Sequence, residues 1–342
     1  MARRRIAVIG AGMAAPPHAQ SLLDLADRIE VAGVFSRERD KLDRFAERFA
    51  LPVTDALEPL LADPSIEAVM VLTPPTTHLE VVERAVAAGK HVLLEKPVEA
   101  TLARATRLVE LVERAGVTLG IVLQLRFRPN ALRLEALIRG GELGAIAAAS
   151  AAIRWWRPQS YYDEPGRGTR ARDGGGVLLT QAIHALDLFQ SLAGPIAEVT
   201  SFAATSALHR METEDLVCAG VRFAGGALGT IDATTASYPG FPERLEFVGT
   251  RGTAVLHGNG ALDLFWQDGR AESFEGEGRF GGGADPMAFA HDHHRAVLTD
   301  FLDALDRRRA PKVSGREALK VHRLIDALLR SSETRRPVAL AE

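Results

Sequence analysis

Residues 5–15 read RIAVIGAGMAA, an apolar run that ends in a glycine-rich turn. The run from Ile6 to Ile9 is rich in β-branched residues, which favour a buried strand. Gly10 allows a sharp turn, and Gly12 has no Cβ, so a pyrophosphate can approach the backbone where the next helix begins. With Ala15 the pattern is Gly-x-Gly-x-x-Ala, which predicts a dinucleotide-binding turn, although an ordinary strand-to-helix turn can show these glycines by chance.

Composition narrows the class of protein. The chain has 342 residues, a net charge of −3, 46% hydrophobic and 25% charged residues, which is typical of a globular protein of two domains. We expect no nucleic-acid partner, because no large basic surface is implied. Cys218 is the single cysteine, which fits a reducing compartment, and we expect a cytoplasmic protein. No stretch approaches the roughly 20 apolar residues that span a membrane, and we interpret Arg3-Arg4-Arg5 as a solvated lead-in rather than part of a signal peptide.

Strand and helix patterns alternate over the first third of the chain. Strands are expected at 6–9, 30–35, 66–72, 91–94 and 117–123, and helices at 16–30, 38–50, 79–88 and 101–115. Strands separated by helices predict a parallel, doubly wound sheet. We therefore expect a Rossmann domain over residues 1–123.

The pattern changes after residue 124. Several strands follow one another between 196 and about 275 without intervening helices, which predicts a mostly antiparallel sheet. The other expected elements are helices at 130–139, 177–192, 287–308 and 315–331, a strand at 145–156, and loops at 157–176 and 276–286. The chain is thus expected to be α/β, with a second α/β domain over 124–342 that contains an open, mostly antiparallel sheet.

The end of the second expected strand bears on which dinucleotide binds. About 20 residues after the glycines, a carboxylate would hold the ribose 2′-OH of NAD. Ser36 and Arg37 stand there instead. Ser36 can hydrogen-bond a 2′-phosphate and Arg37 can pair with it, which favours NADP, with NAD kept open. The alternative is that Arg37 is only a solvated surface residue.

Short motifs follow one another along nearly the whole chain. They are Gly10-Ala11-Gly12, His18, Thr73-Pro74-Pro75 with His78, Glu95-Lys96-Pro97, Arg126-Phe127-x-Pro129, Gly174-Gly175-Gly176 with His184 and Asp187, Asp300-Phe301-Leu302-Asp303-Ala304, Val313-Ser314-Gly315-x-Glu317-Ala318, and Ser331-Ser332. In this order and spacing the chain resembles the Gfo/Idh/MocA oxidoreductases. The resemblance implies NAD(P)-dependent oxidation or reduction of sugars, polyols and related carbonyl compounds. It also implies a homodimer or homotetramer that forms through the open sheet.

Residues expected to contact the cofactor come from the turns and strand ends of the first domain. They are Gly10, Gly12, Met13, Ser36, Arg37, Thr73, Pro74, Pro75, His78, Glu95, Lys96 and Gln124. Lys96 follows a strand's carboxyl end, where its ammonium can polarise a substrate oxygen. The resemblance gives Lys96 this role and implies that the Lys96–Pro97 peptide bond is cis.

Hydride transfer also needs a group that takes or gives the hydroxyl proton. The resemblance points to His184, whose titration range suits this task; the alternative is a buried histidine satisfied by the backbone. Many relatives carry an Asp four residues earlier, where Thr180 stands here, so the acid–base role moves onto His184 and Lys96. Thr180 can still bind substrate or relay a proton, and Asp187 either orients His184 or anchors its helix.

Arginines and aromatic residues crowd the stretch 154–172, which suits a polyhydroxylated and anionic substrate. We expect substrate contacts from Arg126, Arg157, Tyr161, Thr180 and His184. The histidines at 291, 293 and 294 raise the question of a metal, but the resemblance supplies none and we expect none.

Two further classes of function stay open. One is a non-catalytic regulator that binds NAD(P) on the same fold. The other is an NAD-dependent lyase or glycosidase, as in some members of the family that the chain resembles.

Overall fold

The computed structural model describes residues 3–277 and 290–340, whose contacts divide the chain into two units. Unit 1 comprises Met1–Gln124 and Ala290–Leu319, and unit 2 comprises Leu125–Phe289 and Lys320–Glu342. Most of the Gly-rich stretch expected as a loop at 276–286 lies outside the described residues. None of the described helices is both long and apolar enough to cross a membrane.

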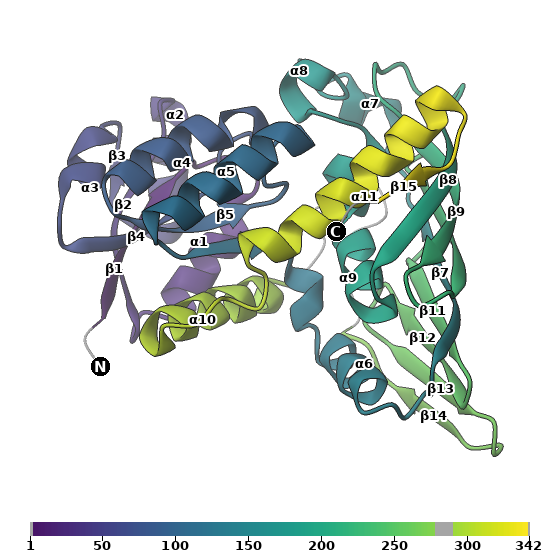
Figure 1. The fold of residues 1–342 in the computed structure, drawn as a ribbon. Helices are drawn as coiled ribbons and strands as arrows, with labels where there is room; N and C mark the ends of the chain where they lie inside the picture. Colours follow the sequence, from purple (N-terminus) through teal and green to yellow (C-terminus); the bar gives the residue numbers. More distant parts are fainter. Residues whose placement is uncertain (1–2, 278–289, 341–342) are drawn as a thin grey trace. The chain divides into compact units, whose positions relative to one another are not determined.

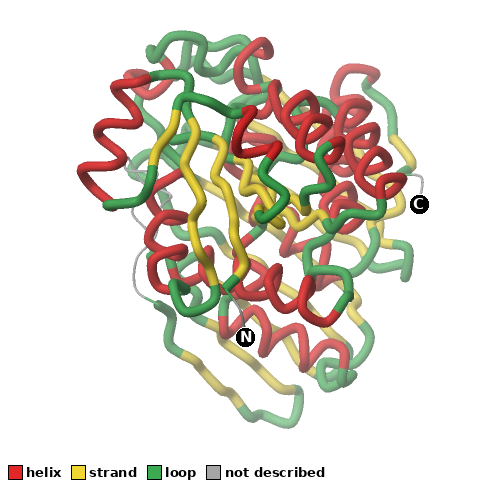
Figure 2. Tube along the Cα trace, turned by 90° about the vertical axis from the view of Figure 1, so that its left-hand side faces the viewer, coloured by secondary structure: helices red, strands yellow, loops and turns green. Residues whose placement is uncertain are grey.

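Unit 1 is built on a six-stranded parallel sheet in the order β3-β2-β1-β4-β5-β6 (Figures 1 and 2). The strands are β1 (Arg4–Ile9), β2 (Ile29–Phe35), β3 (Val53–Thr54), β4 (Ile66–Val71), β5 (His91–Glu95) and β6 (Leu119–Val122). Because the strand order reverses between β1 and β4, their carboxyl ends border the crevice where such sheets bind ligands. The expected doubly wound sheet is confirmed.

Helices cover both faces of this sheet. They are α1 (Ala15–Asp24), α2 (Arg39–Phe49), α3 (Glu58–Ala62), α4 (His78–Ala87), α5 (Leu102–Ala115) and α10 (Asp292–Arg307). Figure 1 shows α4 beside α5, and α1 beside α10. Right-handed crossovers on the two sides of the switch point place the α4–α5 pair and α1 on opposite faces.

Helix α10 departs from the expected division at residue 123, which assigns all of 124–342 to the second domain. Residues 290–319 instead belong to unit 1. The reason is that α10 buries Val297, Leu298 and Phe301 in unit 1, packing against α1 and β6. A Cβ on Gly120 of β6 would lie 3.0 Å from the Phe301 ring, so the glycine makes room for this helix.

Unit 2 contains a nine-stranded sheet in the order β14-β13-β12-β11-β7-β10-β9-β8-β15. Its strands are β7 (Ile146–Arg154), β8 (Ile196–Ala204), β9 (Leu216–Phe223), β10 (Leu228–Thr234), β11 (Arg244–Gly249), β12 (Gly252–His257), β13 (Leu262–Trp266), β14 (Ala271–Phe274) and β15 (Val338–Ala339). Among the described pairings only β7–β10 is parallel, so the expected mostly antiparallel sheet is confirmed.

One face of this sheet is covered by helices. The helices of unit 2 are α6 (Pro129–Arg139), α7 (Gln159–Tyr162), α8 (Arg170–Asp173), α9 (Ile183–Ala193) and most of α11 (Gly315–Thr334). Helix α9 packs on β7 and β11, and α6 packs on α9 and β12. Ala151 and Ile153 of β7 and Phe247 of β11 are buried in this core.

The α1–α10 contact contains a buried ionisable group. His294 of α10 is 4% exposed, and its ring meets His18 of α1 edge-on with centroids 4.9 Å apart. Burial, with a smaller effect of the neighbouring His18, lowers the pKa of His294 from 6.5 to about 3. The folded protein therefore resists protonation at a site where the unfolded chain accepts it.

We predict that His294→Phe reduces the loss of stability on acidification. Between pH 6.5 and 3 the unfolded state of the native chain binds a proton that folded His294 rejects, so the free energy of unfolding decreases as pH falls. At pH 5 this difference amounts to about 2 kcal/mol, which the variant should lack. Urea unfolding at pH 7 and pH 5 measures it, with the half-exposed His257→Phe as control. An identical loss in both variants would contradict the assignment.

Candidate active site

The turn after β1 matches the requirements of a phosphate-binding turn. Gly10 has φ +116°, and a Cβ there would lie 2.8 Å from the backbone of Leu72, so a larger residue cannot replace it. A Cβ on Gly12 would meet nothing within 4 Å, which leaves open space beside the N-terminal end of α1. Met13 is exposed next to it. A phosphate can approach the backbone here.

The end of β2 presents Ser36 and Arg37. Ser36 is largely buried, and its hydroxyl oxygen accepts a hydrogen bond from the Glu38 N–H at 3.2 Å. Arg37 is exposed, and in residues 3–277 and 290–340 its guanidinium has no hydrogen-bond or ion-pair partner. No carboxylate occupies the two positions directly after β2.

His78 ties together the loops that follow β4 and β5. Its Nε2 lies 2.8 Å from the carbonyl oxygen of Thr73, and its Nδ1 lies 3.0 Å from that of Pro97. The side chain is fully buried, and burial lowers its pKa. His78 is expected to contact the cofactor, and the structure shows its ring nitrogens directed at carbonyl oxygens of the two loops. It therefore supports Thr73, Pro74 and Pro75 from beneath.

Glu95 and His18 hold the backbone at Lys96. One carboxylate oxygen of Glu95 accepts the Lys96 N–H at 2.9 Å, and the other lies 2.7 Å from His18 Nε2. Burial opposes ionisation of Glu95, but the hydrogen bond from His18, with a further contribution from the Lys96 charge, outweighs it and lowers the pKa of Glu95 to about 2. Glu95 is thus a buried carboxylate, so His18 is the donor. The Glu95 carboxylate thereby positions the backbone of Lys96.

Lys96 follows β5 at the carboxyl edge of the sheet, and its side chain is partly exposed. The Lys96–Pro97 peptide bond is cis, as expected. Gln124 follows β6 at the same edge, and its Oε1 has no hydrogen-bond partner among the residues that the structure describes. These positions border one edge of the unit 1 sheet, together with Gly10 and Thr73.

His291, His293 and His294 raise the question of a metal site, but His291 and His294 have different partners in the structure. His291 pairs with Asp24 at 2.7 Å. His294 groups instead with His18 and Glu95, and their potential ligand atoms lie within 4.8 Å of one another. Within this cluster His18 and Glu95 share a 2.7 Å hydrogen bond, and His294 meets His18 through an edge-on ring contact.

In unit 2 the expected helix 177–192 begins with a π-helix, Leu178–Ala182, and continues as α9. Glu214 holds its start, accepting hydrogen bonds from the N–H groups of Gly176 at 3.1 Å and Leu178 at 3.2 Å. A Cβ on Gly176 would lie 1.9 Å from the Glu214 carbonyl oxygen, so only glycine fits. π-helical turns often occur at functional sites.

Thr180 lies in this π-helix, and partly exposed His184 lies in the first turn of α9. The Thr180 hydroxyl is 2.7 Å from the Gly176 carbonyl oxygen and also contacts Gln181 Oε1. Both neighbours are acceptors, so Thr180 donates its proton to them. These contacts fix the orientation of the Thr180 hydroxyl within the π-helix.

Arg126 and Asp187 form a buried pair within unit 2. The Arg126 Nε and Nη2 groups each donate to a different Asp187 oxygen at 2.6 Å. The sequence analysis left two roles open for Asp187, and this bidentate contact supports the anchoring of α9. It also corrects the expectation for Arg126, since this edge of its guanidinium is engaged by Asp187 rather than offered to a substrate.

Residues of the aromatic and arginine-rich loop differ in how far they are buried. Arg157 is only 2% exposed, and its Nη1 donates to the Trp156 carbonyl oxygen at 2.8 Å, so it supports the loop rather than facing a ligand. The Tyr161 hydroxyl accepts from Arg167 Nη1 at 2.7 Å and lies 3.4 Å from Gln181 Nε2. Tyr161 is thereby joined to Thr180 through Gln181.

Sequence reasoning did not single out Glu214, Gln181 or Arg167 as site residues. Arg167 lies in the arginine-rich loop that the sequence analysis highlights, and Gln181 directly follows Thr180, so position gave a partial signal for both. The sequence gave no signal for Glu214, because only the fold brings it to Gly176. Burial raises the pKa of the Glu214 carboxyl.

Comparison with known proteins agrees with this arrangement. Residues 4–122 match the model of an oxidoreductase family with an NAD-binding Rossmann fold, and residues 131–255 match a GFO/IDH/MocA C-terminal domain. A myo-inositol 2-dehydrogenase of Thermotoga maritima is 28% identical, over 99% of both chains. A D-xylose 1-dehydrogenase (NADP(+)) of Haloferax volcanii is 25% identical, over 92% of this chain and 93% of that protein.

A solved structure is also similar along the whole chain. It is the WlbA dehydrogenase of Bordetella pertussis in complex with NADH and UDP-GlcNAcA, with 26% identity, full coverage of both chains and a TM-score of 0.85. Because the two family models together match more than half of the sequence, the chain belongs to the Gfo/Idh/MocA family of oxidoreductases.

Proposed function

We propose that this oxidoreductase transfers a hydride between a nicotinamide cofactor, with NADP preferred, and a secondary alcohol or ketone of a sugar or polyol. The observation that carries the proposal is Lys96, whose backbone is held by the Glu95 carboxylate at the carboxyl edge of the unit 1 sheet. The similar myo-inositol and D-xylose dehydrogenases support a sugar-like substrate.

Each residue has a chemical task in this proposal. The bound cofactor supplies the hydride acceptor or donor. The Lys96 ammonium stabilises negative charge that develops on the reacting oxygen. His184 takes the hydroxyl proton during oxidation and returns it during reduction. Thr180, in the π-helix that precedes α9, binds a substrate hydroxyl.

Preference for NADP rests on Ser36 and Arg37. A 2′-phosphate would pair with the exposed guanidinium of Arg37 and hydrogen-bond the hydroxyl of the neighbouring Ser36. The similar D-xylose dehydrogenase is named for NADP(+), whereas the WlbA structure holds NADH, so binding measurements are required to choose.

We predict that the protein binds NADPH at least about tenfold more tightly than NADH, and that Arg37→Asp reverses the order. The new carboxylate would repel a 2′-phosphate and accept a hydrogen bond from a ribose hydroxyl. Fluorescence titration with both nucleotides measures the two dissociation constants. Arg39→Asp is the matched control, since Arg39 is also exposed but pairs with Asp43. Tighter binding of NADH by the native protein would disprove the NADP assignment.

We predict that Lys96→Met and His184→Asn each lower kcat about 10²- to 10⁴-fold on a sugar or polyol that the native enzyme turns over. Both variants should still bind NADPH, because neither change removes the phosphate-binding turn. Stopped-flow absorbance of the reduced nicotinamide measures turnover, with the exposed Lys41→Met as control.

The same experiment separates the other classes of function. NADPH binding without turnover of any polyol or sugar would favour a regulator. A tightly retained cofactor with substrate cleavage but no net redox change would favour the lyase or glycosidase alternative.

We further propose a cytoplasmic homodimer or homotetramer that forms through the open face of the unit 2 sheet. By strand register, Phe202 of β8, Leu228 of β10 and Phe265 of β13 lie on this face, and all three are at least half-exposed. Exposed apolar side chains on one face are typical of an interface.

We predict that Phe202→Glu shifts the protein toward monomer, because a buried unpaired carboxylate destabilises an apolar interface. Sedimentation velocity measures the mass of native and variant protein, with Leu132→Glu on α6 as control. A native protein that sediments as a monomer would refute the oligomer.

A further inference from the structure

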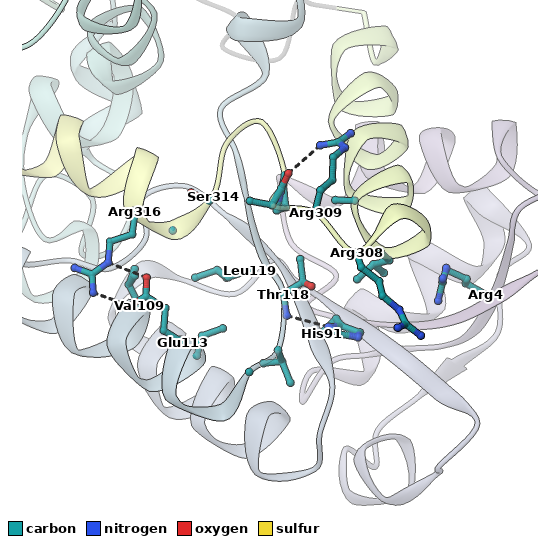
Figure 3. Close-up of a pocket in the computed structure, with 18 residues that line it drawn as sticks. Arg4, His91, Val109, Glu113, Thr118, Leu119, Arg308, Arg309, Ser314 and Arg316 are labelled. Atoms are coloured by element: carbon teal, nitrogen blue, oxygen red, sulfur yellow. Dashed lines mark hydrogen bonds and ion pairs between the residues drawn. The ribbon is translucent and has the colours of Figure 1, made fainter.

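A cavity of about 650 Å³ opens at the amino edge of the unit 1 sheet (Figure 3). The starts of β1, β5 and β6 line it at Arg4, His91 and Leu119, together with α5 and the segment that joins α10 to α11. Because all strands of this sheet are parallel, this edge is opposite the carboxyl edge that carries Gly10 and Lys96. Its volume lies in the range of small-molecule sites.

The cavity combines an apolar wall with a cationic one. Val117 lines it with a partly exposed apolar side chain, and the largely buried Val109, Val112, Leu119 and Pro311 form the rest of the apolar wall. Four arginines also line it, namely Arg4, Arg308, Arg309 and Arg316, against a single acidic lining residue, Glu113. Figure 3 shows Arg4, Arg308 and His91 toward one end and the Arg316–Glu113 pair toward the other.

Three of these arginines are already paired. Arg4 contacts Asp306 at 2.8 Å, Arg309 contacts Asp300 at 2.6 Å, and Arg316 makes a bidentate contact with Glu113 at 2.6 and 2.7 Å. Arg308 differs, since within the described part of the chain its side chain has no hydrogen-bond or ion-pair partner. The cavity therefore retains one uncompensated cation.

His91 adds a hydrogen-bond donor beside this cation. Its Nδ1 accepts the Thr118 N–H at 2.9 Å, which places the proton of the neutral ring on Nε2. Burial, together with the charge of Arg4, lowers the pKa of His91 and so favours this neutral form. One fixed donor and one unpaired guanidinium at the same end of a cavity suit a carboxylate, sulfonate or phosphate.

We propose that this cavity is a second small-molecule site, separate from the dinucleotide site, which takes an organic anion. The apolar body of the ligand packs on Val117, the partly exposed part of the apolar wall. Its anionic group binds Arg308 and the Nε2–H of His91.

The probe for the test is anilinonaphthalene sulfonate, whose aromatic body matches the apolar wall of the cavity and whose single anionic group matches its cationic end. It is titrated into the full-length protein in the presence of saturating NADPH or NADH, whichever binds more tightly, because such dyes also enter dinucleotide sites. Isothermal titration calorimetry gives the stoichiometry and the dissociation constant.

Two substitutions address the cavity directly. Arg308→Gly removes the guanidinium at a position with φ 52°, which glycine adopts freely, so the variant is expected to fold. Arg335→Gly is the matched control, because Arg335 has φ 54° and does not line the cavity. Val117→Trp fills the cavity from a partly exposed position.

We expect one dye per chain that persists with saturating nucleotide, about tenfold weaker binding in Arg308→Gly, a larger loss in Val117→Trp, and native affinity in Arg335→Gly. Displacement of the dye by nucleotide, absence of binding, or equal affinity in all variants would overturn the proposal. Loss in Val117→Trp alone would overturn the assignment of an anion. Thermal unfolding confirms that each variant is folded.

Discussion

A buried carboxylate organises the reactive edge of unit 1. Glu95 lies beneath the end of β5 and remains ionised because His18 donates to one oxygen while the Lys96 backbone donates to the other. Burying a charge is costly unless such partners are present, so α1 must place His18 within hydrogen-bonding distance of β5. The same histidine meets His294 of α10. His18 thus links α1 to β5 through Glu95 and to α10 through His294.

Unit 2 follows a similar physical rule with different residues. The π-helix that carries Thr180 begins on Glu214, and α9 is anchored by the Arg126–Asp187 pair. A hydrogen-bonded charge restricts a side chain or a backbone more strongly than apolar packing alone, because few geometries satisfy it. Thr180 and His184 are therefore presented on a segment whose backbone is held at its start and along its length.

Helix and strand positions were largely predictable, because they depend on local patterns. Alternating apolar strands and amphipathic helices indicated the parallel sheet, and the helix-free spacing after 196 indicated the antiparallel one. The π-helix was not predictable, since it depends on Glu214 meeting Gly176 across 38 residues. Strands β14 and β15 were also missed. They are short, and β15 pairs with β8, which lies far away in the sequence.

The sequence by itself determined the dinucleotide turn, the family resemblance and the set of residues from which a site could be built. Glycine positions and motif spacing are local properties, so no knowledge of the fold was needed to recognise them. Only the tertiary structure decided which of these side chains are buried and which groups they contact. His78, Glu95 and Arg157 are expected to contact a ligand, but their side chains are buried. Arg126 is paired with Asp187. Glu95 and His18 are 77 residues apart and Arg126 and Asp187 are 61 apart, so only the packing of the chain brings these partners together.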